Sequence, residues 1–177
     1  MRGKQQRRTK KQMTWRKQNS SFFKVVIASA FSLALPFCAI ICPFSAAATT
    51  LADADGLLLQ NKLKQAEDAY RELLEEDQTG DAYAGLAVAL AKQSWPAKLL
   101  EAEKLLKKAK EKFSDNPNVI AAAGYVSYVH SKTVASPAKR DLYLEAAEKL
   151  CKKAIKENPS IVIAQQTLGM VKIAQDD

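Results

Sequence analysis

Two stretches of the chain have the same make-up, "KKAKEKFSDNPNVIAAAG" from Lys107 to Gly124 and "KKAIKENPSIVIAQQTLG" from Lys152 to Gly169. In each stretch an alanine is followed by Asn-Pro and then by a glycine, and the alanine and the glycine are 15 residues apart. Apolar residues recur at helical spacing on both sides of each proline. Both stretches therefore predict the end of one helix, a turn at the proline, and the start of the next helix.

Helical periodicity continues from Thr49 to the C-terminus, and no strand-like alternation interrupts it. Helix breaks with a candidate cap or a proline occur at Ser94-Trp95-Pro96, Asn116-Pro117, Ser136-Pro137 and Pro159-Ser160. The breaks predict three helix pairs and a last single helix: 51–61 with 62–76, 81–93 with 96–113, 117–130 with 137–157, and then 160–175. We therefore predict an all-α fold, a short α-solenoid of about three helical hairpins plus a C-terminal capping helix.

Small residues recur at fixed positions within these pairs. The second helices carry stripes that begin at an alanine and continue four and seven residues later: Ala66, Tyr70, Leu73; Ala102, Leu106, Ala109; Ala147, Cys151, Ala154. The first helices carry Leu86-Ala87, Ala123-Gly124 and Leu168-Gly169. Since two helices approach to about 8 Å only where their facing side chains are small, both sets predict close antiparallel packing.

These positions resemble the tetratricopeptide repeat, with its W-x2-L-G-x2-Y, A-x3-F and P pattern. The match is best in "QQTLGMVK", where Leu168-Gly169 stand at the Leu-Gly step and Gln165 replaces Trp. "YAGLAVAL" supplies four first-helix positions, and Ala147, Cys151, Ala154 and Pro159 fit the second-helix positions and the closing proline. The resemblance covers roughly Leu51 to Gln175.

The repeat spacing departs from the usual period of about 34 residues. Ala66 and Ala102 are 36 residues apart, and Ala102 and Ala147 are 45 apart. Most of the surplus falls in "SKTVASPAKRDLY", for which we expect a long turn and an extended second helix. The first repeat's opening helix matches poorly, because Asp53 and Ala54 stand where Leu and Gly are expected. Another helical-pair solenoid is the alternative.

The N-terminus has the three-part order of an export signal. A basic region (1–24) with nine of the 27 Lys and Arg precedes an apolar region (25–48) that ends in small residues, and no acidic residue occurs before Asp53. We expect cleavage near Ala48, which leaves a helical repeat domain over 49–177 that is exported (periplasmic or secreted). The alternatives are a membrane anchor over 25–44, with the repeat domain outside the cytoplasm, and an organelle-targeting segment.

The folded region has no surplus of positive charge. From Thr49 onward the chain has 18 basic and 19 acidic residues, so the net charge of +8 arises in the N-terminal region. A domain that binds nucleic acid through phosphates needs such a surplus, so we expect no nucleic-acid partner. The alternative is a cytoplasmic protein whose segment 2–24 is a nucleic-acid-binding arm.

Signals for catalysis, cofactors or metal ions are scarce. His130 is the only histidine, and Cys151 is the only cysteine that remains after cleavage, so we expect no metal site and no cofactor. Cys151 is expected to be a buried small residue; the alternatives are a thiol that pairs between chains and a Cys151–His130 nucleophile. We expect no enzymatic activity, and the alternative is an uncharacterised cell-envelope enzyme subunit.

The resemblance implies a binding function. In tetratricopeptide proteins the first helices line a concave groove that holds a peptide or a partner helix. By position in the motif, the groove residues here would be Val88, Ala91, Lys92, Tyr125, Tyr128, Val129, Gln166, Met170 and Ile173. This largely apolar set favours a protein or peptide partner, unless the residues pack only against neighbouring helices. The expected function is thus an exported or membrane-anchored adaptor.

Overall fold

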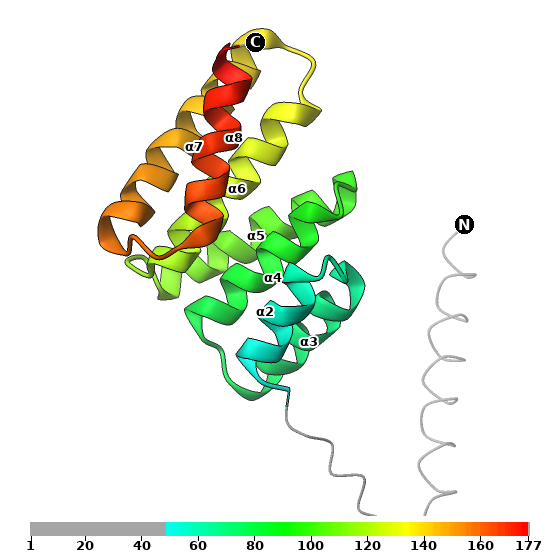
Figure 1. The fold of residues 1–177 in the computed structure, drawn as a ribbon. Helices are drawn as coiled ribbons and strands as arrows, with labels where there is room; N and C mark the ends of the chain where they lie inside the picture. Colours follow the sequence, from blue (N-terminus) through cyan, green and yellow to red (C-terminus); the bar gives the residue numbers. More distant parts are fainter. Residues whose placement is uncertain (1–48, 177) are drawn as a thin grey trace, which may run out of the picture. The chain divides into compact units, whose positions relative to one another are not determined.

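The computed structural model describes residues 49–176, which form seven helices and no strand (Figure 1). The helices are α2 (Leu51–Leu59), α3 (Leu63–Glu76), α4 (Gly80–Lys92), α5 (Pro96–Lys112), α6 (Pro117–Thr133), α7 (Pro137–Glu157) and α8 (Val162–Asp176). The all-α prediction is confirmed. None of these helices is long and apolar enough to cross a membrane. The regions 1–24 and 25–48, with the candidate anchor at 25–44, lie outside the described residues.

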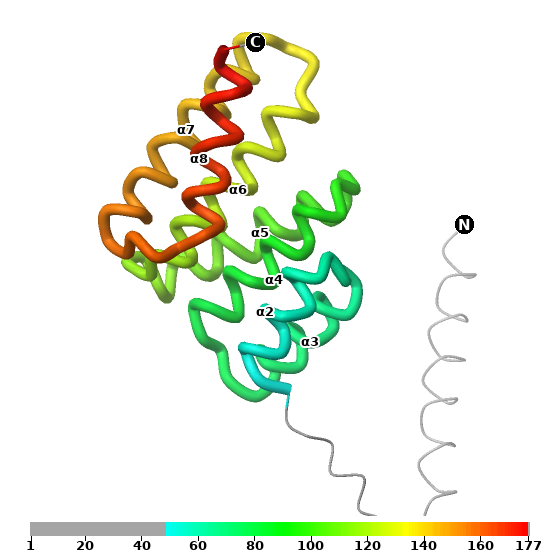
Figure 2. The backbone as a smooth tube through the Cα atoms, viewed as in Figure 1, coloured from blue at the N-terminus to red at the C-terminus, as the bar shows by residue number. Residues whose placement is uncertain are grey.

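The helices pack as consecutive pairs, α2 with α3, α4 with α5 and α6 with α7, and α8 packs against both α6 and α7. The backbones of successive first helices also lie side by side, from α2 through α4 and α6 to α8, whereas the backbones of α3, α5 and α7 do not approach one another closely. Helices on the inner side of a curved stack lie closer together than those on the outer side. The helices α2, α4, α6 and α8 therefore form the inner row, an arrangement that fits a short α-solenoid (Figure 2).

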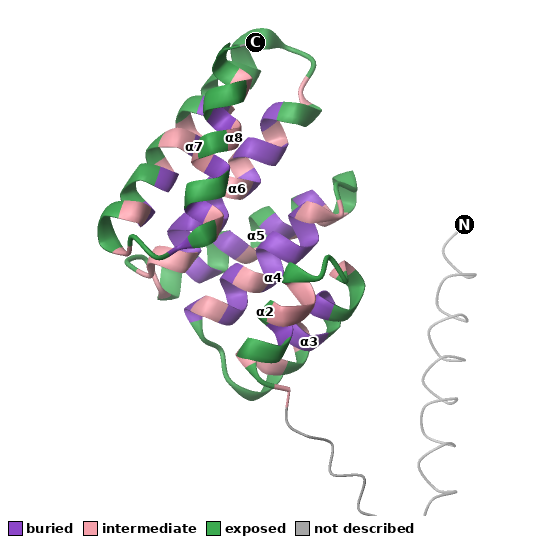
Figure 3. Ribbon diagram, viewed as in Figure 1, coloured by how far each residue is buried: buried purple, intermediate pink, exposed green. Residues whose placement is uncertain are grey.

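Burial follows this arrangement. Ten of the 13 residues of α4 are buried, and α6 is buried along most of its length (Figure 3). Both helices are apolar on nearly every side, so each can be covered by several neighbours. By contrast, α3, α5 and α7 carry lysine and glutamate on their outer faces, which remain exposed.

Small residues lie where the paired helices meet, as the sequence predicts. The following alanines have no exposed surface: Ala54, Ala66, Ala87, Ala102, Ala109, Ala147 and Ala154. Gly124 of α6 lies directly against α7, because a Cβ at this position would be 2.7 Å from Cys151 Sγ and 3.3 Å from the Ala147 carbonyl oxygen. The α6 backbone thus approaches α7 more closely than any residue with a side chain would allow.

For Gly169 the prediction of close helix packing is wrong. This glycine is exposed, and a Cβ built on it would meet no atom within 4 Å. The reason is its place in the chain. Gly124 is covered by the second helix of its own pair, whereas no second helix follows α8 within the described residues.

Helix ends differ from prediction in two ways. The expected long turn after His130 is short, because α6 continues to Thr133 and α7 begins at Pro137, so most of the insertion lengthens the helices. Of the expected caps, Asn116 accepts hydrogen bonds from the backbone N–H groups of Asn118 and Val119, but Ser136 makes no side-chain cap bond. Ser94 is not a cap either, because it has φ 57° and follows the end of α4.

A partly buried ionic cluster joins the first pair to the second. Glu67 of α3 is buried, and its carboxylate accepts hydrogen bonds from Lys98 of α5 (2.6 Å), Gln93 (2.7 Å) and Arg71 (2.9 Å). Burial alone would raise the pKa of Glu67, but the three donors outweigh it and lower the pKa to about 2. Glu67 therefore stays charged and holds α3 against the start of α5.

The two glycines at corresponding positions, Gly124 after Ala123 and Gly169 after Leu168, should respond oppositely to substitution by alanine. Gly124→Ala should lower the free energy of unfolding by about 1–2 kcal/mol, because the added methyl overlaps a packed thiol. Gly169→Ala should raise it by about 0.5–1 kcal/mol, since alanine favours the helix and the space is open. Chemical denaturation measures both.

The control for this prediction is the double variant Gly124→Ala/Cys151→Ala. Removing the Cys151 sulfur makes room for the new methyl, so the double variant should be more stable than Gly124→Ala/Cys151→Ser. Equal changes in stability for Gly124→Ala and Gly169→Ala would contradict the proposed difference in packing.

Candidate binding groove

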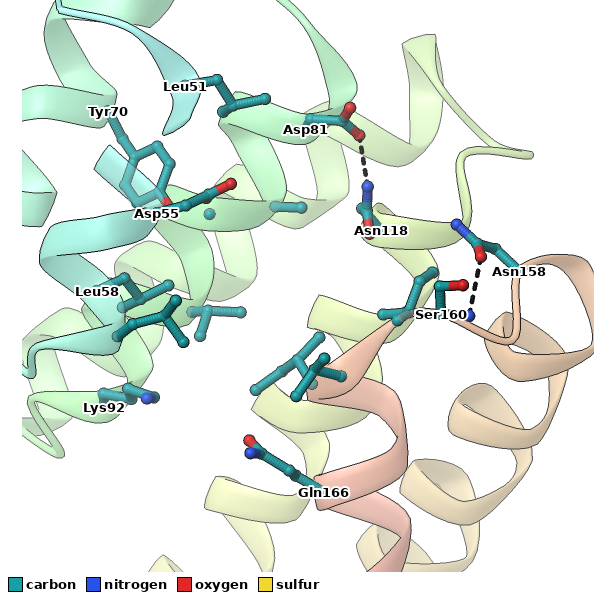
Figure 4. Close-up of a pocket in the computed structure, with 17 residues that line it drawn as sticks. Leu51, Asp55, Leu58, Tyr70, Asp81, Lys92, Asn118, Asn158, Ser160 and Gln166 are labelled. Carbon is teal, nitrogen blue, oxygen red and sulfur yellow. Dashed lines mark hydrogen bonds between the residues drawn. The ribbon is translucent and has the colours of Figure 1, made fainter. Parts of the chain in front are cut away.

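The inner row of helices contains a cavity of about 370 Å³ between α2, α4 and the start of α8 (Figure 4). We call this cavity the inner groove. Its lining residues are Leu51, Asp55, Leu58, Leu59, Tyr70, Asp81, Ala84, Gly85, Val88, Lys92, Asn118, Asn158, Ser160, Ile161, Val162, Ile163 and Gln166. Helices that are far apart in sequence thus form one site.

The floor of the inner groove is one stripe of α4. Its residues follow steps of four, three and four along the helix, Asp81, Gly85, Val88 and Lys92, and such a series stays on one face of an α-helix. Gly85 and Val88 in the middle are small or apolar, and the two ends are charged. Thr79 caps α4 by accepting a hydrogen bond from the Ala82 N–H, which sets the register of the stripe.

One wall of the inner groove comes from α2, through Leu51, Asp55 and Leu58. Both ends of this short helix are well defined. Thr50 and Asp53 form a capping box at the start. At the other end the Lys62 N–H donates to the Leu57 carbonyl, and Asn61 adopts φ 58°, which ends the helix in a Schellman motif. The wall is thus firmly positioned although α2 has only nine residues.

The opposite wall comes from the turn before α8 and from its first residues, Ile161, Val162, Ile163 and Gln166. Asn158 shapes this turn, since its side-chain oxygen accepts a hydrogen bond from the Ser160 N–H (3.0 Å). Ile161 is buried, whereas Val162 is 56% exposed. The wall therefore combines an anchored residue with an apolar side chain open to solvent.

Tyr70 reaches the inner groove from α3, the second helix of its pair. Its ring lies directly against Gly85, where any Cβ would overlap it, so the absence of a side chain at Gly85 is required. The Tyr70 hydroxyl donates a hydrogen bond to the Asp55 carboxylate. Burial, and then the bond to Asp55, raise the pKa of Tyr70 far above its ordinary range.

Asp81 is held by the start of α6. Its Oδ1 atom accepts hydrogen bonds from the side-chain amides of Asn118 (2.9 Å) and Asn116 (3.0 Å). Because Asn116 also caps α6, the same residue joins the N-terminal ends of α4 and α6. The two amides orient the carboxylate, and no Lys, Arg or His among residues 49–176 forms an ion pair with it.

The residues predicted to line the groove fall into two groups. Val88, Lys92 and Gln166 line the inner groove. The others lie outside its lining: Ala91, Tyr128 and Val129 are buried in the core, Tyr125 and Met170 are half-buried against it, and Ile173 is 67% exposed. Tyr128 also carries the Lys132 ammonium 4.6 Å above its ring centroid.

Sequence reasoning missed the contribution of α2. Because the sequence of this helix fits the motif poorly, the motif predicts no groove residue in it. The available signal was the spacing of Leu51, Asp55 and Leu58, which places three side chains on one helical face. Ala54, one of the residues that depart from the motif, is fully buried.

His130 and Cys151 have different surroundings. Cys151 is fully buried against Gly124, and burial raises the pKa of its thiol to about 11, as expected for a small core residue. His130 stacks on Tyr143, with 5.2 Å between the ring centroids, and its Nε2 lies 2.7 Å from Glu103 Oε1. His130, Tyr143 and Glu103 line a second cavity, of about 290 Å³, between α5, α6 and α7. Cys151 does not line this cavity.

Comparison of the chain with models of protein families, with curated proteins and with solved structures gives no match. The inner groove is therefore interpreted from its own geometry.

Tyr70 should make the domain sensitive to alkaline pH. Because its pKa is raised in the folded state, its contribution to stability is complete below pH 10 and is lost as the pH rises above that value. Tyr70→Phe should lower the free energy of unfolding by about 1 kcal/mol at pH 7, since Asp55 loses a hydrogen bond. It should also reduce the loss of stability between pH 9 and about pH 11 in denaturation experiments.

The matched control is Tyr143→Phe, which removes a hydroxyl outside the inner groove. Its stability should change with pH as that of the unmodified protein does. If Tyr70→Phe shows the same pH profile as the unmodified protein, the coupling between Tyr70 and Asp55 is refuted.

Proposed function

We propose that this chain is a tetratricopeptide-like adaptor that binds a protein or peptide segment in the inner groove, and that it acts by binding rather than by catalysis. The floor of the groove is apolar at its centre, and its walls come from helices at opposite ends of the described region. Such a site suits an elongated ligand that touches several repeats together.

The observation that carries this proposal is the exposure of apolar side chains on the groove walls. Leu59 on α2 is 81% exposed and Val162 on α8 is 56% exposed, and both line the inner groove. Exposed leucine and valine gain stability when a ligand removes them from water, at about 25 cal/mol per Å² of apolar surface buried. A partner with apolar side chains is therefore the ligand that these walls favour.

We further propose that the repeat domain acts outside the cytoplasm. The support is the basic, apolar and small-residue order of segment 1–48. Cleavage near Ala48 would release the domain, and retention of 25–44 would anchor it to the membrane. Either outcome places the inner groove in the same compartment as exported or envelope partners.

Removing the exposed apolar groups should weaken binding without unfolding the protein. Leu59→Ser/Val162→Ser should reduce the affinity for peptides selected on the unmodified protein by about tenfold, because two apolar contacts are lost. Fluorescence anisotropy with labelled peptides measures this change. The matched control, Leu100→Ser/Leu142→Ser, removes exposed leucines of α5 and α7 that do not line the inner groove. Equal losses in both double variants would refute the groove.

Intact mass and cell fractionation test the compartment. We expect the expressed protein to lack residues 1–48 and to leave the cytoplasm. A full-length mass in the membrane fraction would support the anchor instead. A full-length chain in the cytosol would contradict both forms of the proposal and would favour the basic-arm alternative.

A further inference from the structure

The inner groove has an acidic end and a basic end on the same helix. Asp81 and Lys92 are eleven residues apart on α4, close to three full turns, so both project from one side of the helix. At 1.5 Å per residue, their Cα atoms are about 16 Å apart along the helix axis. Figure 4 shows the two side chains at opposite ends of the cavity. A ligand lying along α4 therefore meets a carboxylate at one end and an ammonium at the other.

The charges of the inner groove have no ionic partner among residues 49–176. The ion pairs in this part of the chain involve Glu67, Glu101, Glu103 and Glu148, and none involves Asp55, Asp81 or Lys92. Asp81 accepts bonds only from neutral amides, and Asp55 accepts one from a neutral hydroxyl. Asp81 and Lys92 are half-buried and Asp55 is exposed, and charges at such positions are stabilised when a ligand supplies the opposite charge.

The space between the two ends suits an extended chain. The cavity of about 370 Å³ extends between charged ends that are about 16 Å apart along the axis of α4. An extended peptide rises about 3.3 Å per residue, so five residues cover the distance from Asp81 to Lys92. The half-buried Leu58 and Ile163 offer apolar surface along the way.

We propose that the inner groove selects an extended peptide segment with a basic and an acidic residue about five positions apart and apolar residues between them. This inference rests on the proposed function and names its class of partner. The Lys or Arg of the partner pairs with Asp81, with Asp55 nearby on the α2 wall. Its Asp or Glu pairs with Lys92, and its apolar side chains cover Leu58 and Ile163.

The test is selection from a display library of random 12-residue peptides on the expressed protein in its processed form. We expect the selected peptides to combine a basic and an acidic residue four to six positions apart, several-fold above their frequency in the library. Lys92→Glu should replace the acidic preference by a basic one. Asp81→Asn, which keeps an acceptor for the two amides, should lose the basic preference and retain the acidic one.

Defined peptides then give the size of each effect. For a selected peptide, replacing either charged residue by alanine should weaken binding about threefold to tenfold in fluorescence anisotropy. When the acidic residue of the peptide is replaced by alanine, the loss of affinity should disappear in the Lys92→Glu variant. A purely structural role of Lys92 would not produce this result. The matched control variants are Lys104→Glu and Asp68→Asn, two exposed positions outside the lining of the inner groove. Both should select the same peptides as the unmodified protein.

Each remaining outcome is decisive. Peptides whose binding depends on Leu59 and Val162 but that show no charge preference would overturn this inference and leave the proposed function intact. Selected charges spaced ten or eleven residues apart would indicate a helical ligand and would also overturn it. If no selected peptide is sensitive to Leu59→Ser/Val162→Ser, both the inference and the proposed function fail.

Discussion

Close contact between helix backbones is the constraint on which the described domain depends. Gly124 brings α6 against the Cys151 sulfur and the Ala147 carbonyl, and fully buried alanines occupy the other crossings. Interiors are packed as densely as organic crystals, so one added methyl at such a crossing must displace a neighbour. The inner groove depends on a similar close contact at Gly85. Because Gly85 has no side chain, the Tyr70 ring can lie against α4 and its hydroxyl can reach Asp55.

Much of the fold could be predicted because its signals are local. Apolar spacing and the prolines at 96, 117 and 137 give the helices and their pairing, and all three prolines begin helices in the structure. Local signals fail where the answer depends on distant neighbours. Gly124 and Gly169 stand in the same motif position, yet only Gly124 is covered, since coverage requires a following helix. Ser94 resembles a cap in sequence, but the end of α4 places it at positive φ.

The site could be predicted only in part for the same reason. The motif gives the helix face that turns inward, and Val88, Lys92 and Gln166 do line the inner groove. The motif does not predict how far neighbouring helices cover this inward face. The inner face of α6 is covered by α4 and α8, so Tyr128 and Val129 become core. The α2 wall is open, and it supplies residues that the sequence motif does not identify.

The distribution of charge separates the residues that hold the stack together from those that remain available. Glu67 and Glu148 each accept hydrogen bonds from several donors at the seams between helices. Glu67 is buried, so an unpaired carboxylate at its position would be costly. Asp55, Asp81 and Lys92 face the inner groove with only neutral hydrogen-bond partners or none in the described range. These three can satisfy a ligand's charges without breaking an ion pair of the fold, so binding there need not weaken the stack.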